Sequence, residues 1–188
     1  MNILTDKLPT KIKVNKNIYD INYDYKTAIK TLMAFEDNEL TQNEKCYILL
    51  NNIYKDKIPK NYEIEAINKA IKFLNLGVDI KDNKDEEKPR IYSFKKDSSY
   101  IYSGISQSHN IDLESENNFH FWKFMSLFMD MTPECMFGEI IYYRKRKQEG
   151  KLTKEEKQQY NKIKDLLELE QVKVESEARR NFFREFNS

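Results

Sequence analysis

The stretch Phe119–Met129, FHFWKFMSLFM, is the most apolar part of the chain and decides its fold. Its aromatic side chains recur at helical spacing and cover more than one side of the helix that they predict. A helix with so broad an apolar surface is usually buried in a protein core. We therefore predict a central core helix over these residues.

Helical patterns also precede this core helix. An apolar stripe runs through residues 25–36, and Thr41 with Glu44 forms a capping-box pattern at the start of a second helix. Asn61 is placed to cap a third helix, for which Gly77 provides a C-terminal stop. The first half of the chain is therefore predicted to be mainly helical.

Helix-capping signals also lie directly before and after the core helix. Asp97 is the predicted N-cap of the helix before it, and Pro133 is expected in the first turn of the helix after it. That later helix ends in Arg144–Lys147, where cations complement the helix dipole. Thr153 with Glu156 is a second capping-box pattern, which opens a charged helix near the C-terminus.

In the N-terminal region, apolar residues recur at every second position and not at helical spacing. Lys11–Tyr25 reads KIKVNKNIYDINYDY, in which Ile12 and Val14 alternate with lysines before a turn at residues 15–17. Alternation resumes after the turn, so this region predicts a β-hairpin. An isolated hairpin is only marginally stable in water, so this one must pack on the helices.

These patterns together give a fold class and a division of the chain. With only four glycines and four prolines, the sequence is poor in the turn residues that a β-sandwich or barrel requires. We predict a mostly α fold: a small N-terminal β-hairpin packed on a multi-helix bundle, with a charged C-terminal helix. The predicted segments are a hairpin and helical segment (1–78), a charged linker or loop (79–92), a core helical segment (93–150) and a charged helical tail (151–188).

The tail allows two interpretations. Residues 154–186 fit a helix, but LELEQVKV within them also alternates as a strand does. The three aromatic residues Phe182, Phe183 and Phe186 form either a separate adhesive terminus or a frayed end.

Composition excludes several classes of protein. The formal net charge of +1 argues against a dedicated nucleic-acid-binding domain, which usually concentrates positive charge. No apolar run approaches the roughly 18 residues of a membrane-spanning helix, and residues 1–8 lack the pattern of a signal peptide. Cys46 and Cys135 are expected to be buried thiols, as in a reducing compartment. We therefore expect a cytosolic protein.

Motifs of catalysis are missing from the sequence. Glycine-rich phosphate loops, G-x-S-x-G, HExxH and zinc-spaced cysteine pairs are not found. His109, His120 and Cys135 are the only set worth considering for a metal, and a hydrogen bond within the fold is the preferred interpretation of His120. We expect no catalytic residue, no cofactor and no metal, and hence a protein that binds other proteins.

Two aromatic groups are candidate partner-binding residues. They are Phe119, Phe121 and Trp122 on the core helix, and Tyr142, Tyr143 and Arg144 near the end of the next helix. The competing interpretation places them in the core, and we favour it for Trp122 and Phe128. The run Arg144–Lys147 is also the best candidate for a nucleic-acid patch, although cations at a helix end are the simpler explanation.

The second half of the chain contains two aromatic-rich stretches, DSSYIYSGISQSHNIDLESENNFHFWKFMSLFMDM (97–131) and FGEIIYYRKRK (137–147). In these stretches it resembles the phage gene-product-fifteen family of tail proteins. The family pattern is matched in order at Asp97, Tyr100, Ile101, Tyr102, Gln107, Ile111, Asp112, Leu113, His120, Trp122, Lys123, Phe124, Leu127, Phe128, Ile140, Tyr143 and Arg144. The likeness extends over about Leu8–Leu167 and leaves the tail after Leu169 uncovered.

The resemblance implies a tail assembly chaperone. Such a protein would bind the tape measure protein in the host cytoplasm, keep it soluble and help to recruit tail tube subunits, with self-association possible. No membrane partner is expected, and nucleic acid is a disfavoured one. The alternatives are a structural component of the phage tail and a small phage nucleic-acid-binding protein that uses Arg144–Lys147.

Overall fold

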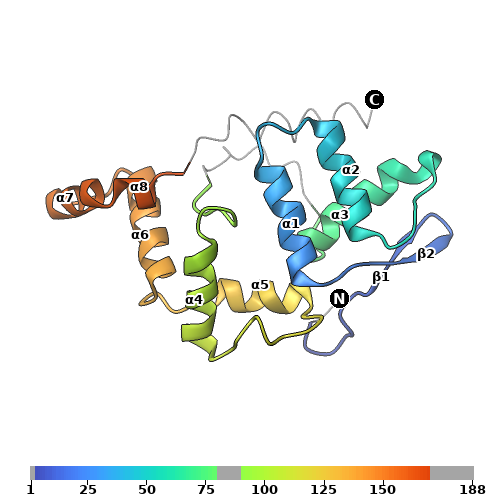
Figure 1. Ribbon diagram of the computed structural model, residues 1–188, viewed down its shortest axis with the longest axis horizontal. Helices are drawn as coiled ribbons and strands as arrows, with labels where there is room; N and C mark the ends of the chain where they lie inside the picture. The colour runs from blue at the N-terminus through green and yellow to red at the C-terminus, as the bar shows by residue number, and fades with distance from the viewer. Residues whose placement is uncertain (1–2, 80–89, 170–188) are drawn as a thin grey trace. The chain divides into compact units, whose positions relative to one another are not determined.

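A computed structural model describes residues 3–79 and 90–169 of the chain (Figure 1). Within these ranges the chain forms eight α-helices, one short 3-10 helix and a two-stranded antiparallel sheet. The predicted fold class, mostly α with an N-terminal hairpin, is confirmed. The predicted tail beyond Leu169 and most of the predicted charged loop lie outside the described residues.

Contacts group the chain into two compact units. Of the described residues, the first unit holds 3–79 and 118–124, and the second holds 90–117 and 125–169. Residues 118–124 therefore belong with the N-terminal half, although they are separated from it in sequence.

The hairpin of the first unit consists of β1 (Lys11–Val14) and β2 (Asn17–Asp20). The strands pair in antiparallel register, with Ile12 opposite Tyr19 and Val14 opposite Asn17. Ile12 and Val14 are buried, as their alternation with lysines predicts. The backbone N–H of Asn15 in the turn donates to the carboxylate of Glu65, 3.0 Å away, and so ties the hairpin to the helices.

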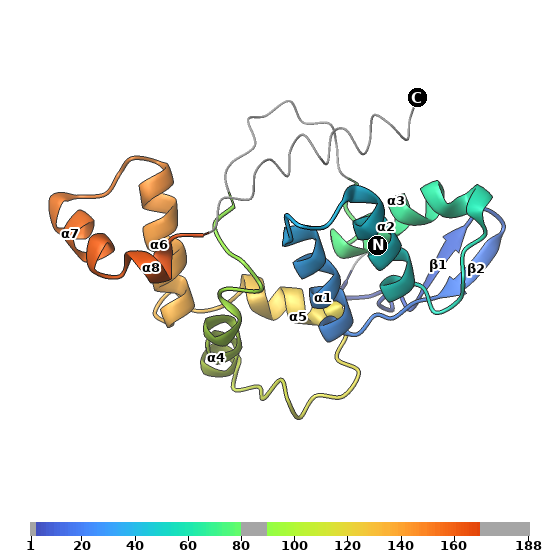
Figure 2. The same ribbon diagram turned by 45° about the horizontal axis from the view of Figure 1, so that its top comes forward.

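Three helices follow the hairpin: α1 (Tyr25–Glu36), α2 (Gln42–Ile53) and α3 (Glu63–Leu74) (Figures 1 and 2). The capping box of Thr41 and Glu44 opens α2, as predicted. Asn61, however, does not cap α3. It lies inside a 3-10 helix (Lys60–Tyr62) that leads directly into α3, so α3 begins without a side-chain cap.

The end of α3 uses the predicted glycine in an unexpected way. The N–H of Leu76 donates to the carbonyl of Phe73, and the N–H of Gly77 donates to the carbonyl of Lys72. This is a Schellman pattern in which Leu76, with φ +55°, takes the left-handed position and Gly77 follows it. Gly77 also has a positive φ, of +82°, and lies against the indole of Trp122.

Residues 118–124 complete the core of the first unit. The N–H of Phe121 donates to the carbonyl of Tyr23, and the N–H of Tyr25 donates to the carbonyl of Phe119. Trp122 is buried, and its indole N–H donates to the carbonyl of Phe73 at 2.9 Å. The sequence predicted one helix over residues 119–129, but Phe119 and His120 form this strand-like connection and the helix starts only afterwards.

The remaining helices are α4 (Ser98–His109), α5 (Phe121–Met129), α6 (Met136–Gln148), α7 (Lys154–Lys162) and α8 (Lys164–Leu167). Two predicted helix starts differ in detail. Pro133 lies in the turn before α6, whose N-cap is Cys135. Asp97 occupies the N-cap position of α4, but its side chain makes no capping bond.

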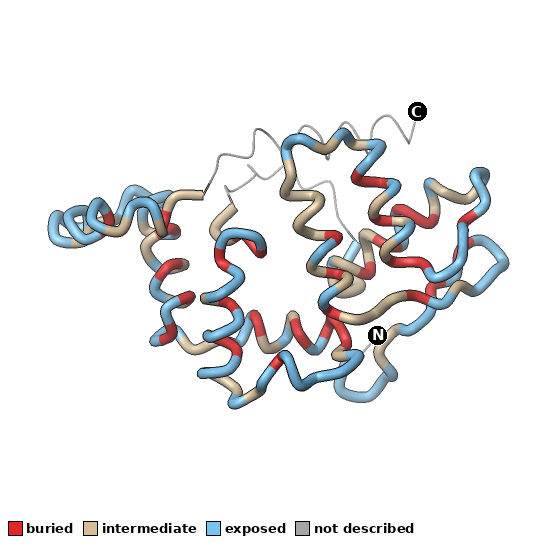
Figure 3. Tube along the Cα trace, in the orientation of Figure 1, coloured by how far each residue is buried: buried red, intermediate tan, exposed pale blue. Residues whose placement is uncertain are grey.

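Two apolar clusters form the core of the second unit. Phe128 packs against Phe94 and Phe137 with ring-centroid distances of 5.4 and 5.5 Å, which are favourable for aromatic pairs. Ile140, Tyr160 and Leu167 form the other cluster, which joins α6 to α7 and α8. Figure 3 shows that α7 is otherwise largely exposed. No helix within residues 3–79 and 90–169 has the length and apolar run that crossing a membrane requires.

Candidate functional site

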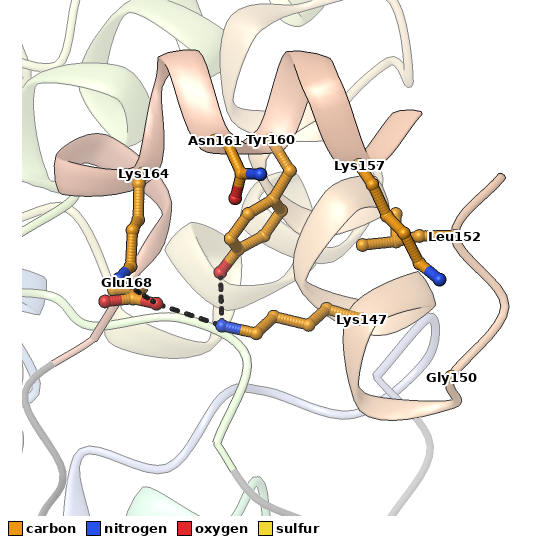
Figure 4. Close-up of a pocket in the computed structure, with 8 residues that line it drawn as sticks. All are labelled: Lys147, Gly150, Leu152, Lys157, Tyr160, Asn161, Lys164 and Glu168. Carbon is orange, nitrogen blue, oxygen red and sulfur yellow. Dashed lines mark hydrogen bonds and ion pairs between the residues drawn. The ribbon is translucent and has the colours of Figure 1, made fainter. Parts of the chain in front are cut away.

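A groove opens in the second unit between the end of α6 and the two helices that follow it (Figure 4). Its volume is about 430 Å³. We call it the α6–α8 groove and define it by its lining residues: Lys147, Gly150, Leu152, Lys157, Tyr160, Asn161, Lys164 and Glu168.

The turn between α6 and α7 shapes this groove. The N–H of Gly150 donates to the carbonyl of Lys147, and the N–H of Lys151 donates to the carbonyl of Arg146. These bonds form a Schellman motif, with Gly150 at φ +66° in the left-handed position that glycine favours. The capping box of Thr153 and Glu156 then starts α7, as the sequence predicts.

Glu156 also links α7 to α6. Its carboxylate accepts a hydrogen bond from the hydroxyl of Tyr142 at 2.6 Å and another from Nε of Arg146 at 3.0 Å. The hydrogen bond from Tyr142 and the backbone N–H of Thr153 lower the pKa of Glu156 below its usual value. The same bond raises the pKa of Tyr142. One capping residue therefore fixes both the start of α7 and its attachment to α6.

Inside the groove, Lys147 lies between a hydroxyl and a carboxylate. Its ammonium group donates to the hydroxyl of Tyr160 and to the carboxylate of Glu168, both at 3.0 Å. Lys164 approaches the same carboxylate at 3.7 Å. These bonds raise the pKa of Lys147, to which Tyr160 contributes most, and Lys147 in turn lowers the pKa of Glu168. The groove thus holds one carboxylate between two lysines (Figure 4).

Arg144, also on α6, is buried and makes several hydrogen bonds. Its guanidinium group binds Asp97 through two bonds, of 2.6 and 2.9 Å, and only 4% of Arg144 is exposed. It also donates to the backbone carbonyls of Ile91, Leu166 and Leu167. The five bonds match the five N–H donors of a guanidinium group, so this cation is fully satisfied inside the protein.

The six predicted partner-binding residues are not equally accessible. Phe121, Trp122 and Arg144 are buried, at 0%, 4% and 4% exposure, and Phe119 and Tyr143 are half-buried. Tyr142 is the exposed one, at 47%. The core interpretation of Trp122 and Phe128 is therefore confirmed, and Arg144 likewise serves the interior of the second unit.

The basic run Arg144–Lys147 does not form a single cationic patch. Arg144 points into the core, Arg146 pairs with Glu156 and Lys147 pairs with Glu168. Three of the four charges of the run are thus balanced by a carboxylate, so the run offers less free positive charge than its sequence suggests. Helical periodicity explains this, because successive residues of a helix point in different directions.

His120 and the two cysteines have contacts that stabilise the fold. Nε2 of His120 lies 3.0 Å from the carbonyl of Pro9, and its Nδ1 accepts a hydrogen bond from the N–H of Trp122. The predicted hydrogen bond of His120 within the fold is thus confirmed. Cys46 and Cys135 are buried as predicted, and burial raises the pKa of Cys46 to about 11. In the part of the chain that the structure describes, no three His, Cys, Asp or Glu side chains gather where a metal would bind.

Sequence reasoning missed the most constrained pair of the second unit. Asp97 and Arg144 are 47 residues apart, and the sequence suggested a helix cap for one and a surface charge for the other. Both residues belong to the family pattern, but Asp97 follows two lysines and Arg144 opens a basic run, so their neighbours in sequence mark neither of them as buried.

Comparison with known proteins gives one match. The family model described as "Bacteriophage Gp15 protein" matches residues 4–169, which include both described ranges almost completely. No curated protein and no solved structure matches the chain.

Proposed function

Because the chain belongs to the bacteriophage Gp15 protein family, we propose that it is a tail assembly chaperone that acts in the host cytoplasm. In this proposal it binds the tape measure protein, keeps it soluble and helps to recruit tail tube subunits. The observation that carries the proposal is the family match over residues 4–169. The role is one of binding and requires no catalytic residue.

The physical basis of the proposal is the solubility of the partner. A tape measure protein has long apolar helical stretches, which aggregate when they are exposed to water. A small helical protein can cover such stretches by helix-in-groove recognition. Tube subunits must later displace it, so each contact should be weak and many copies should bind along one partner.

Tyr142 is the predicted partner-binding residue best placed for such contacts. It is 47% exposed on α6, and its hydroxyl bond to Glu156 limits its rotation. Tyrosine supplies a large apolar area at a low cost in side-chain entropy. Such a side chain is suited to the weak, repeated contact that we propose.

The test is co-expression with the tape measure protein encoded by the same genome. We expect the tape measure protein to move into the soluble fraction and to co-purify with this chain. The variant Tyr142→Ala should reduce the amount recovered. Tyr47→Ala is the matched control, since Tyr47 is a tyrosine that is 70% exposed but lies on α2 of the first unit.

An insoluble tape measure protein with no complex would contradict the proposal. Mass spectrometry of purified phage particles separates the chaperone from a structural component of the tail. A chaperone should be missing from finished particles, whereas a structural component should be present in them.

A further inference from the structure

We propose that the α6–α8 groove binds a carboxylate-rich helical segment of the protein partner, and that Glu168 occupies the position that a partner carboxylate takes in the complex. The inference rests on the proposed function, because it names the chemistry of the segment that a chaperone of this kind would recognise. It uses the groove, the charges that line it and the carboxylate already held there.

The groove carries an excess of positive charge. The groove is lined by three lysines and one glutamate, so its formal charge is 3 − 1 = +2. Two of the lysines share Glu168, while the ammonium group of Lys157 has no ion-pair or hydrogen-bond partner among the described residues. The groove therefore retains positive charge after its internal ion pairs are counted, and an acidic ligand would balance it.

The lysines of the groove already bind one carboxylate, that of Glu168. The side chain of Glu168 is 43% exposed, and it meets Lys147 at 3.0 Å and Lys164 at 3.7 Å. An ion pair this exposed contributes little to stability, so its exchange for a similar pair costs little. Glu168 thus demonstrates that the two lysines form a carboxylate site and leaves that site open to competition.

The backbone around Glu168 is held independently of the Glu168 side chain. Its carbonyl accepts a hydrogen bond from the ammonium group of Lys96, which also donates to the carbonyl of Asp165 at 2.6 Å. These bonds involve the backbone and not the side chain. The carboxylate of Glu168 can therefore leave the lysines while the end of α8 stays in place.

The lining of the groove indicates which kind of ligand fits it. Leu152 and Tyr160 give the groove an apolar part beside its lysines. A helix that carries carboxylates next to leucines matches both parts, because residues four apart lie on the same face. A nucleic-acid strand matches only the lysines, since its phosphates do not complement the apolar part of the groove.

The experiment uses the full chain and a synthetic helical peptide with glutamates and leucines on one face. Its binding is measured by fluorescence anisotropy, beside a control peptide with glutamine in place of every glutamate. The double variant Lys147→Gln and Lys164→Gln should weaken binding of the acidic peptide about tenfold, as expected for two partly exposed ion pairs. Glu168→Gln should strengthen it about threefold, because the competing carboxylate is removed.

Lys162→Gln is the matched control. Lys162 is an exposed lysine of α7 that does not line the groove, so this variant should bind the acidic peptide as the wild type does. The far-UV circular dichroism melt of each variant shows whether it is folded. Equal binding of the glutamate and glutamine peptides overturns the inference, as does an effect of Lys162→Gln equal to that of the double variant.

Two further outcomes separate this inference from the proposed function. If the tape measure protein co-purifies equally with the wild type and the double variant, the chaperone role stands and the groove is not its carboxylate site. If the acidic peptide binds as expected but the tape measure protein never co-purifies, the groove chemistry stands and its partner is another acidic protein.

If a single-stranded oligonucleotide binds and only the double variant loses it, the groove binds phosphates and the peptide inference is overturned.

Discussion

Arg144 and Asp97 form a two-bond ion pair that is almost completely removed from solvent, with 4% and 0% of their side chains exposed. Loss of one partner leaves an uncompensated buried charge, which costs about 3–5 kcal/mol. We therefore expect Arg144→Met to lower the free energy of unfolding by about that amount in urea titrations. Arg146→Met is the control, because its pair with Glu156 is partly exposed and is worth about 1 kcal/mol. Similar losses for both variants would contradict this account.

Gly77 and Gly150 both have a positive φ, but only Gly77 is crowded. A Cβ added at Gly77 would lie 2.9 Å from the indole of Trp122, whereas nothing lies within 4 Å of one at Gly150. Gly150→Ala should therefore cost about 1 kcal/mol of backbone strain. Gly77→Ala should cost about 1–3 kcal/mol more, because the buried indole must also shift. Urea unfolding of the two variants measures the difference, and equal costs would show that Trp122 moves freely.

His120 should make stability depend on pH. Its Nδ1 accepts the N–H of Trp122, so the ring is neutral with its proton on Nε2, and burial is the main cause that lowers its pKa below 6.5. As pH falls below 6.5, the unfolded chain takes up a proton before the folded chain does. The free energy of unfolding should then fall, by at most about 1.4 kcal/mol per pH unit.

The variant His120→Gln tests this expectation. Urea unfolding at about pH 7.5 and about pH 5.5 should show a smaller decrease for this variant than for the wild type. His109→Gln removes the other histidine and should leave the decrease intact. An unchanged decrease in His120→Gln would assign the pH dependence to other groups.

At the residue scale, the sequence predicts burial better than it predicts pairing. Trp122 and Phe128 follow from apolar character alone, and both are buried. The pair of Asp97 and Arg144 does not follow, because each residue also fits a local role at a helix end. A local signal of about 1 kcal/mol cannot reveal a partner that only the tertiary structure brings near.

At the scale of elements, the two capping boxes have the same pattern but different surroundings. Among the described residues, Glu44 bonds only to Thr41 of its own box, whereas Glu156 also binds Tyr142 and Arg146 on α6. We expect Glu156→Ala to lower the urea midpoint further than Glu44→Ala, because it removes a cap and the attachment of α7 together. Equal shifts would mean that the contacts of Glu156 with α6 add nothing to stability.

Helices were predictable wherever a cap coincided with an apolar stripe. Both capping boxes lie where the sequence placed them. Apolar character is a weaker guide to burial at single positions, since Tyr47 of α2 and Ile64 of α3 are 70% and 45% exposed. The start of α5 was predicted two residues early, because Phe119 and His120 form a long-range backbone connection that helical spacing does not reveal.

At the scale of the whole molecule, the predicted segments follow one another along the chain, whereas the two units defined by contacts interleave in sequence. Residues 118–124 belong to the first unit, while residues 125–169 belong to the second. The boundary between the units therefore falls inside α5, which runs from Phe121 to Met129. A boundary within a continuous helix has no turn or linker to mark it, so composition could not reveal it.

This placement of α5 predicts that the two units unfold together. The nine residues of α5 are too few to be stable as an isolated helix in water, so α5 depends on packing at both of its ends. Trp122 and Phe124 are buried in the first unit, and Phe128 is buried in the second. If the second unit unfolds, α5 loses the packing of Phe128, and the surroundings of Trp122 should be lost with it.

The only tryptophan of the chain makes this measurable. Tryptophan fluorescence reports Trp122 in the first unit, while far-UV circular dichroism reports the helices of both units. We expect Arg144→Met, a change in the second unit, to move both urea midpoints by the same amount. Gly77→Ala, a change in the first unit, should also move both urea midpoints by the same amount. A fluorescence midpoint that stays at the wild-type value in Arg144→Met would show that the first unit keeps α5 folded without the second.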